Sequence, residues 1–147
     1  MKKHKAFIIC LAVVYLLALS MNFMTALKYP DLDGEFGHLL ISLFLLSLLL
    51  LYSYFGGKLY SRLMAVGVLG GIVCFAAQHY QSYVSDIGIF DAISAIQYPL
   101  YVMYVAPLFG INLLFDTTPA LYSLMISLLF LTFFIISRVK RVHAHQI

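Results

Sequence analysis

The stretch from Ile87 to Phe115, IGIFDAISAIQYPLYVMYVAPLFGINLLF, decides how this chain is arranged in a membrane. It is apolar over most of its length but is interrupted by Asp91, Pro99 and Pro107. Prolines are tolerated in membrane helices where neighbouring groups satisfy the freed backbone, so they do not by themselves exclude a crossing. The role of this stretch therefore has to be inferred from the composition and the charges of the rest of the chain.

The composition is that of an integral membrane protein. Of the 147 residues, 63% are hydrophobic and only 10% are charged, whereas a soluble domain carries about 25% charged residues. In lipid every backbone N–H and C=O must be bonded internally, which leaves helices or a closed barrel. Because the apolar runs are long and continuous rather than alternating, we predict an all-α integral membrane protein with one membrane domain, residues 1–147.

Four other segments approach the length of about 20 apolar residues that a spanning helix needs. They cover residues 6–27, 38–55, 63–84 and 120–137. The first follows the basic start Met1-Lys2-Lys3-His4-Lys5 and looks superficially like a secretory signal. Its apolar run is longer than that of a usual signal, and no clear cleavage site precedes a soluble domain, so we predict a retained first span.

Positive charge orients the predicted spans, because Lys and Arg are enriched on the cytoplasmic side. An even number of crossings brings three basic groups to that side, namely Lys2, Lys3 and Lys5; Lys58 and Arg62; and Arg138, Lys140 and Arg141. The same arrangement places all six acidic residues outside. We therefore predict four crossings of a bacterial cytoplasmic membrane, a cytoplasmic N-terminus, and a re-entrant or interfacial segment at residues 87–115. Five spans are the alternative.

The third predicted span carries a stripe of small and polar residues. Its members recur at steps of four, three, four and three, which places them on one helical face; they are Gly67, Gly71, Cys74, Gln78 and Gln81. A Gly-x-x-x-Gly pair lets another helix approach closely, and amides in lipid need partners. Three interpretations follow: hydrogen bonding within the bundle, a polar lining for a substrate or lipid headgroup, or a docking face at Gly67 and Gly71 for a protein partner or a second copy.

Other polar positions give weaker signals. Tyr98, Tyr101 and Tyr104 recur every three residues, a spacing that could present their hydroxyls on one side, and packing or interface anchoring is the preferred interpretation. Asn22 and Asn112 are isolated polar groups whose partners the sequence does not identify. The two cysteines form no C-x-x-C pair, which disfavours thiol-redox chemistry.

The predicted outer side gathers a cluster of histidines and carboxylates, namely Asp33, Glu35, His38, His79 and Asp91. These residue types bind divalent cations or transfer protons. No H-E-x-x-H or similar spacing accompanies them, so we interpret them as solvated charges and predict no metal, no cofactor and no catalytic residue. The net charge of +3, without a basic stripe interleaved with aromatics, also disfavours nucleic acid as a partner. The lipid bilayer is the expected partner.

The order of these features resembles that of the VanZ-like family of small bacterial membrane proteins. Over roughly residues 30–110, Asp33 precedes His38, Gln78-His79-Tyr80-Gln81 stands where the family has E-x-x-Q, and Asp91 follows. The chain departs from the pattern because Gln78 replaces the acid and Ala95 occupies the position of an Asn. The resemblance implies a cell-envelope protein whose family includes members linked to resistance to the glycopeptide teicoplanin, with no established reaction.

Three classes of function follow from these observations. The first is a non-enzymatic envelope protein of the resistance or immunity type, acting near the outer face of the bilayer. The second is an accessory subunit of a larger membrane complex. The third is an enzyme or transporter that uses the outer His and carboxylate cluster. The scarcity of charges at membrane depth disfavours an ion-coupled transporter.

Cysteine labelling distinguishes four crossings from five. In a background in which Cys10 and Cys74 are replaced by Ser, Phe115→Cys and His145→Cys supply single probes beside Asp116 and in the tail. With four crossings, a membrane-impermeant maleimide added to intact cells labels the Phe115→Cys variant and leaves the His145→Cys variant unlabelled. Labelling of the tail from outside would contradict the four-crossing arrangement.

Overall fold

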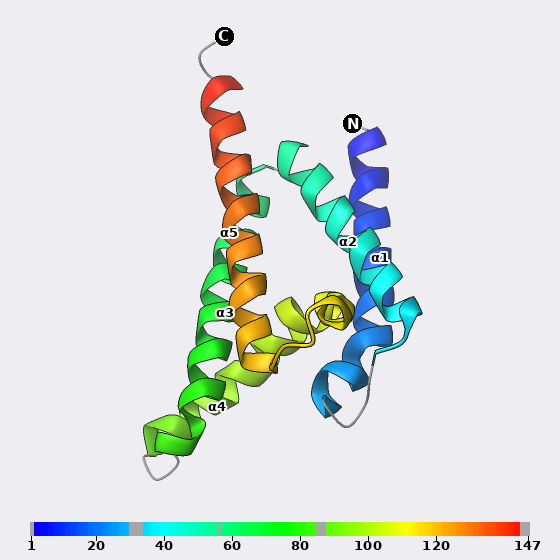
Figure 1. Cartoon of the computed structure of the whole chain (residues 1–147). Helices are drawn as coiled ribbons and strands as arrows, with labels where there is room; N and C mark the ends of the chain where they lie inside the picture. Colours follow the sequence, from blue (N-terminus) through cyan, green and yellow to red (C-terminus); the bar gives the residue numbers. More distant parts are fainter. Residues whose placement is uncertain (1, 30–33, 56, 85–87, 145–147) are drawn as a thin grey trace.

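The computed structural model describes residues 2–29, 34–55, 57–84 and 88–144, and every regular element in these ranges is helical (Figure 1). Four of the helices are long and apolar enough to cross a membrane, as predicted. They are α1 (Lys2–Lys28), α2 (Phe36–Phe55), α3 (Lys58–Val84) and α5 (Pro119–Ala144). The chain between α3 and α5 forms α4 (Gly88–Leu100), a π-helix η1 (Tyr101–Val105) and a 3-10 helix η2 (Ala106–Leu114).

The four long helices form two pairs, with α1 against α2 and α3 against α5. Both ends of the chain lie at the same end of the bundle (Figure 1). The central segment, which we define as α4, η1 and η2, lies between the pairs near the opposite end. Its α4 packs against α3, while η2 packs against both α1 and α2. The central segment therefore joins the two pairs.

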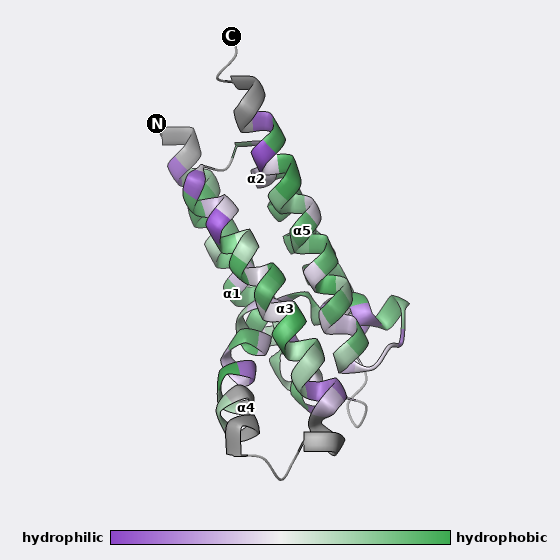
Figure 2. Cartoon of the chain, turned by 90° about the vertical axis from the view of Figure 1, so that its left-hand side faces the viewer, coloured by the Kyte–Doolittle hydropathy of each residue, from purple (hydrophilic) through white to green (hydrophobic). Residues whose placement is uncertain are grey.

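The outer surfaces of the long helices are apolar. Leu16, Leu59 and Leu69 are each more than 60% exposed, and hydrophilic residues gather toward the two ends of the bundle (Figure 2). Exposed apolar surface of this extent is unfavourable in water but favourable in lipid. The helices thus have the surface of an integral membrane protein.

Pro107 explains why the central segment is not one regular helix. Proline has no backbone N–H, so the carbonyl of Met103, four residues earlier, loses its helical donor. The hydroxyl of Tyr15 on α1 donates to that carbonyl at 2.7 Å instead. The break is therefore satisfied by a side chain from another helix, as a water-free environment requires.

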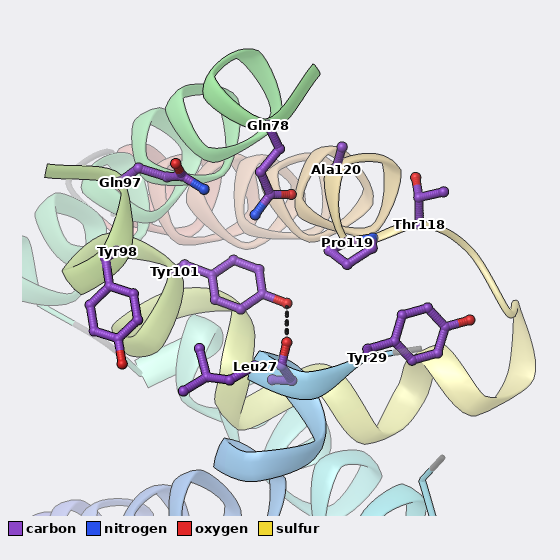
Figure 3. A pocket seen from close by; sticks show the side chains of 10 residues that line it. Leu27, Tyr29, Gln78, Gln97, Tyr98, Tyr101, Thr118, Pro119 and Ala120 are labelled. Carbon is purple, nitrogen blue, oxygen red and sulfur yellow. Dashed lines mark hydrogen bonds between the residues drawn. The ribbon is translucent and has the colours of Figure 1, made fainter. Parts of the chain in front are cut away.

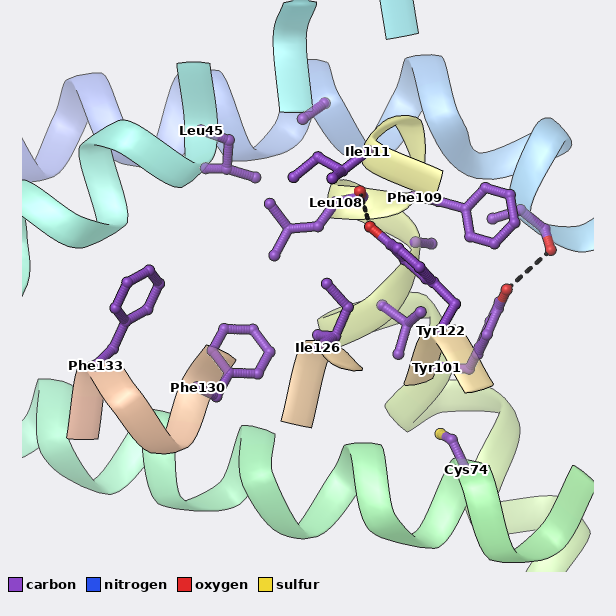
Figure 4. Packing of buried hydrophobic residues seen from close by; sticks show 14 of the residues in the cluster. Leu45, Cys74, Tyr101, Leu108, Phe109, Ile111, Tyr122, Ile126, Phe130 and Phe133 are labelled. Carbon is purple, nitrogen blue, oxygen red and sulfur yellow. Dashed lines mark hydrogen bonds between the residues drawn. The ribbon is translucent and has the colours of Figure 1, made fainter. Parts of the chain in front are cut away.

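Two carbonyls further along the segment, those of Pro107 and Leu108, also accept hydrogen bonds from side chains of other helices. The carbonyl of Pro107 accepts hydrogen bonds from Asn22 Nδ2 at 3.0 Å and Ser42 Oγ at 3.2 Å. The carbonyl of Leu108 accepts one from the hydroxyl of Tyr122, which lies in the buried core (Figure 4). These donors come from α1, α2 and α5, so the irregular backbone links three of the four long helices.

Every residue from Ala106 to Asn112 is buried, which places this part of the predicted 87–115 segment inside the bundle. Gly110 makes the closest approach, because a Cβ at this position would lie 2.0 Å from the carbonyl oxygen of His38. It would also lie 2.7 Å from Ser42 Oγ. The backbones of η2 and α2 can pack this closely only because residue 110 has no side chain.

Gly110→Ala is expected to lower the free energy of unfolding by about 1–3 kcal/mol, because the added methyl group collides with backbone atoms of α2. Unfolding in detergent can be followed by far-UV circular dichroism. Gly57→Ala is the matched control, since a Cβ there meets no atom within 4 Å, and it should leave the stability unchanged. Equal stability of both variants would show that η2 does not contact α2 in this way.

Candidate functional site

A cavity of about 520 Å³ lies at the end of the bundle where α1 and α3 end and α5 begins (Figure 3). We call it the amide cavity, because the side chains of Gln78 and Gln97 line it. Its other polar lining residues are Tyr29, Tyr98, Tyr101 and Thr118. All six are neutral hydrogen-bonding groups.

The small residues of the α3 stripe bring α3 and α5 close together. A Cβ at Gly71 would lie 2.6 Å from the Cβ of Ser127 and 2.7 Å from the carbonyl oxygen of Ser123. One turn earlier, a Cβ at Gly67 would lie 2.9 Å from the ring of Phe130. This face is thus covered by α5 of the same chain, and a partner docking at Gly67 and Gly71 would have to displace α5.

Two polar members of the stripe, Cys74 and Gln78, lie beside the central segment and the amide cavity. The buried thiol of Cys74 donates to the carbonyl of Gln97 at 3.6 Å, which ties the end of α4 to α3. One turn further, Gln78 reaches from α3 toward Tyr101 and Pro119 (Figure 3). Its Oε1 is buried and has no hydrogen-bond partner among the described residues. The side chain of Gln81, the last member of the stripe, lies outside the described part of the chain.

An unpaired buried carbonyl oxygen carries a desolvation penalty of about 1–3 kcal/mol, so most such groups in proteins have a partner. The side chain of Gln78 lines a cavity that is also lined by hydroxyls. A rotation of its amide would turn the unpaired oxygen toward a donor that enters the cavity. The lining of the amide cavity is therefore suited to a polar molecule with hydrogen-bonding groups.

Tyrosines hold the opposite wall of the cavity in place. The hydroxyl of Tyr101 donates to the carbonyl of Ala26 at 3.1 Å, near the end of α1. The hydroxyl of Tyr29 donates to the carboxylate of Asp116, and its ring packs edge-on against Phe109. The end of α1 is thus fastened to η1 and to the turn before α5.

The two histidines of the predicted outer cluster, His38 and His79, do not lie together. His38 caps the start of α2. Its ring Nδ1 accepts a hydrogen bond from the backbone N–H of Glu35 at 2.8 Å, and its backbone N–H donates to the carbonyl of Glu35 at 2.9 Å. His79 stacks instead on Phe75 of its own helix. The start of α2 and the end of α3 lie on opposite sides of the bundle (Figure 1).

Two acidic members of that predicted cluster remain undescribed, since Asp33 and the side chain of Asp91 lie outside the described residues. Among the residues that are described, no group of three or more His, Cys, Asp and Glu side chains could hold a metal ion. The separation of His38 from His79 has a topological cause, because α2 packs against α1 whereas α3 packs against α5.

The tyrosine row divides between two sides of the central segment. Tyr98 and Tyr101 line the amide cavity, whereas the ring of Tyr104 packs edge-on against Phe130. A three-residue step keeps side chains on one side of an α-helix, but Tyr101 and Tyr104 belong to the π-helix, whose turns are wider. The three tyrosines therefore do not share one side, because Tyr104 diverges from Tyr98 and Tyr101.

Two asparagines have structural roles that the sequence did not reveal. Asn22 Nδ2 also donates to Ser42 Oγ at 2.9 Å, which joins α1 to α2. Asn112 closes the turn before α5, because its amide bonds both the carbonyl and the N–H of Thr117. One feature of the sequence could have indicated these roles: each asparagine is isolated in an apolar stretch, and a lone amide in lipid requires a partner.

Comparison with known proteins finds no relative of this chain. No known protein family matches this chain, and neither a curated protein nor a solved structure matches it. The resemblance to the VanZ-like family rests on the short sequence motifs and stays a prediction.

Replacing Gln78 shows whether its amide is a structural or a ligand-binding group. Gln78→Leu is expected to leave the free energy of unfolding within about 0.5 kcal/mol of the parent, or to raise it, because it removes an unpaired polar atom. Asn22→Leu, the matched change, is expected to lower it by about 1–3 kcal/mol, because Pro107 and Ser42 lose a donor. Equal losses in both variants, measured by circular dichroism in detergent, would make Gln78 a structural residue.

Proposed function

We propose that this integral membrane protein is a non-enzymatic component of the bacterial cell envelope that confers resistance or immunity by binding a ligand at the outer face of the membrane. The observation that carries the proposal is the amide cavity, with the unpaired oxygen of Gln78 in its wall. Its volume of about 520 Å³ falls in the usual range of ligand pockets, about 300–1,000 Å³.

The orientation follows from charge. Lys5, Lys58, Arg62 and Lys140 lie near one end of the long helices, which we call the basic end and place in the cytoplasm. The amide cavity is at the other end and therefore faces outward. The end of α3 and the start of α5 both lie at that end. In the proposed orientation the central segment would enter and leave on the outer side, as a re-entrant segment does.

The chemistry of the lining favours recognition over catalysis. Amides and phenols fix the orientation of a polar ligand by hydrogen bonds and stay neutral at physiological pH. A ligand rich in amide N–H groups, such as a peptide or glycopeptide, complements the acceptor at Gln78. An enzyme built on the outer cluster is less well supported, because His38 and His79 are on different helix pairs.

An accessory-subunit role is the second candidate. The amide cavity would then receive a polar side chain from a neighbouring membrane protein rather than a free ligand. Such a subunit requires its partner for stable expression, whereas a resistance or immunity factor protects cells when it is expressed alone.

A protection assay tests the proposal. The chain is expressed alone in a susceptible bacterium, which is challenged with teicoplanin and with a panel of membrane-active bacteriocins. At least one agent should show a fourfold or greater rise in its minimal inhibitory concentration. The double variant Gln78→Leu/Gln97→Leu should lose this protection at unchanged abundance in the membrane.

Thr132→Val is the matched control, because it also removes a polar group but lies on the exposed surface of α5, where the hydroxyl of Thr132 donates to the carbonyl of Leu128 in the same helix. It should protect as well as the parent. Full protection by the double variant would show that protection does not depend on the amide cavity. Absence of protection against every agent, with stable expression, would contradict the resistance or immunity role.

A further inference from the structure

A second cavity, of about 660 Å³, lies on the other side of the central segment. Met103, Pro107 and Leu108 of the central segment line one end of this cavity. Most of the remaining lining comes from α1, α2 and α3 and extends toward the basic end. The wall residues are mostly aliphatic and include Ala12, Leu49 and Leu63. We call it the apolar cavity.

The apolar cavity is accessible from the surrounding bilayer. Leu59, Leu63 and Met103 line it and are 71%, 46% and 53% exposed, so its wall is continuous with the lipid-facing surface of the bundle. An unfilled apolar cavity forfeits dispersion contacts along its lining. A flexible hydrocarbon chain from the bilayer is the occupant that matches this lining and this access.

A basic cluster adjoins the mouth of the apolar cavity. A smaller cavity of about 250 Å³ is lined by Lys58, Arg62 and Arg138, together with Ser61, Ala65 and Phe134. Lys58 lines both cavities, so the basic cluster and the apolar cavity share a wall.

No carboxylate neutralises this cluster within the part of the chain that the structure describes. The described acidic side chains are those of Glu35 and Asp116, which precede α2 and α5 at the opposite end of the bundle. Arg138 instead lies over the ring of Phe134, with its guanidinium carbon 5.3 Å from the ring centre. Three cations around one small cavity form a phosphate-binding arrangement, and guanidinium groups bind phosphate in a bidentate manner.

We propose that this end of the bundle binds one phosphate-bearing lipid. Its phosphate contacts Lys58, Arg62 and Arg138, and one of its acyl chains fills the apolar cavity as far as Leu108. Basic pockets between transmembrane helices are suited to anionic headgroups. This site is at the opposite end from the amide cavity and does not depend on the proposed function.

Native mass spectrometry of the protein in detergent tests the headgroup contact. With added phosphatidylglycerol, one lipid should be retained per chain, and more strongly than phosphatidylcholine. Arg62→Gln/Arg138→Gln should weaken retention of phosphatidylglycerol tenfold or more. Lys140→Gln removes a cation from the same end that faces Tyr54 rather than the cluster, and it should bind like the parent.

A second arm tests the acyl chain and excludes a site for phosphate alone. Ala12→Phe fills the apolar cavity and should abolish retention, whereas Val13→Phe, at a neighbouring position exposed to lipid, should not. Glycerol phosphate, which has the headgroup without chains, should not compete at concentrations at which the lipid saturates the site.

The proposal is overturned if Arg62→Gln/Arg138→Gln retains phosphatidylglycerol like the parent, if Ala12→Phe does, or if glycerol phosphate competes as well as the lipid. Circular dichroism verifies that each variant is folded. If the double arginine variant does not fold, Lys58→Gln replaces it. Lys58→Gln should also lose retention of phosphatidylglycerol, and retention equal to that of the parent would overturn the proposal.

Discussion

The rest of the structure depends on the need to satisfy the backbone of the central segment without water. Pro107 removes one helical donor, and the π- and 3-10 turns around it leave carbonyls without their usual partners. Side chains of the neighbouring helices supply hydrogen bonds to these carbonyls, namely Tyr15, Asn22, Ser42 and Tyr122. Because an unsatisfied carbonyl costs several kcal/mol in a bilayer, these contacts fix where α1, α2 and α5 lie around the segment.

This arrangement divides the interior of the bundle into two chemically different spaces. On one side of η1 and η2 is the amide cavity, lined by neutral hydrogen-bonding groups. On the other side is the apolar cavity, which leads to the basic cluster at Lys58. The same residues that interrupt the helix therefore separate a space suited to a polar ligand from one suited to a hydrocarbon chain.

Part of the candidate site was predictable from local sequence. Gln78 lies on the same face of α3 as Gly67, Gly71 and Cys74, and helical periodicity alone places it there. Gln97 and Tyr101 were not predicted to join it, because their approach depends on the hydrogen bond from Cys74 and on the π-turn. The proximity expected for His38 and His79 failed for a related reason, since periodicity within a span does not specify which spans are neighbours.

The sequence by itself determined that the chain is helical and integral to a membrane, because long apolar runs can satisfy their own backbone only as helices. It also determined which ends of the helices carry the basic residues. Only the tertiary structure decided that α1 pairs with α2 and α3 with α5, and that η2 packs against α2 at Gly110. Those choices depend on close contacts between residues far apart in the chain, such as Tyr15 with Met103 and Asn22 with Pro107, and no local pattern encodes them.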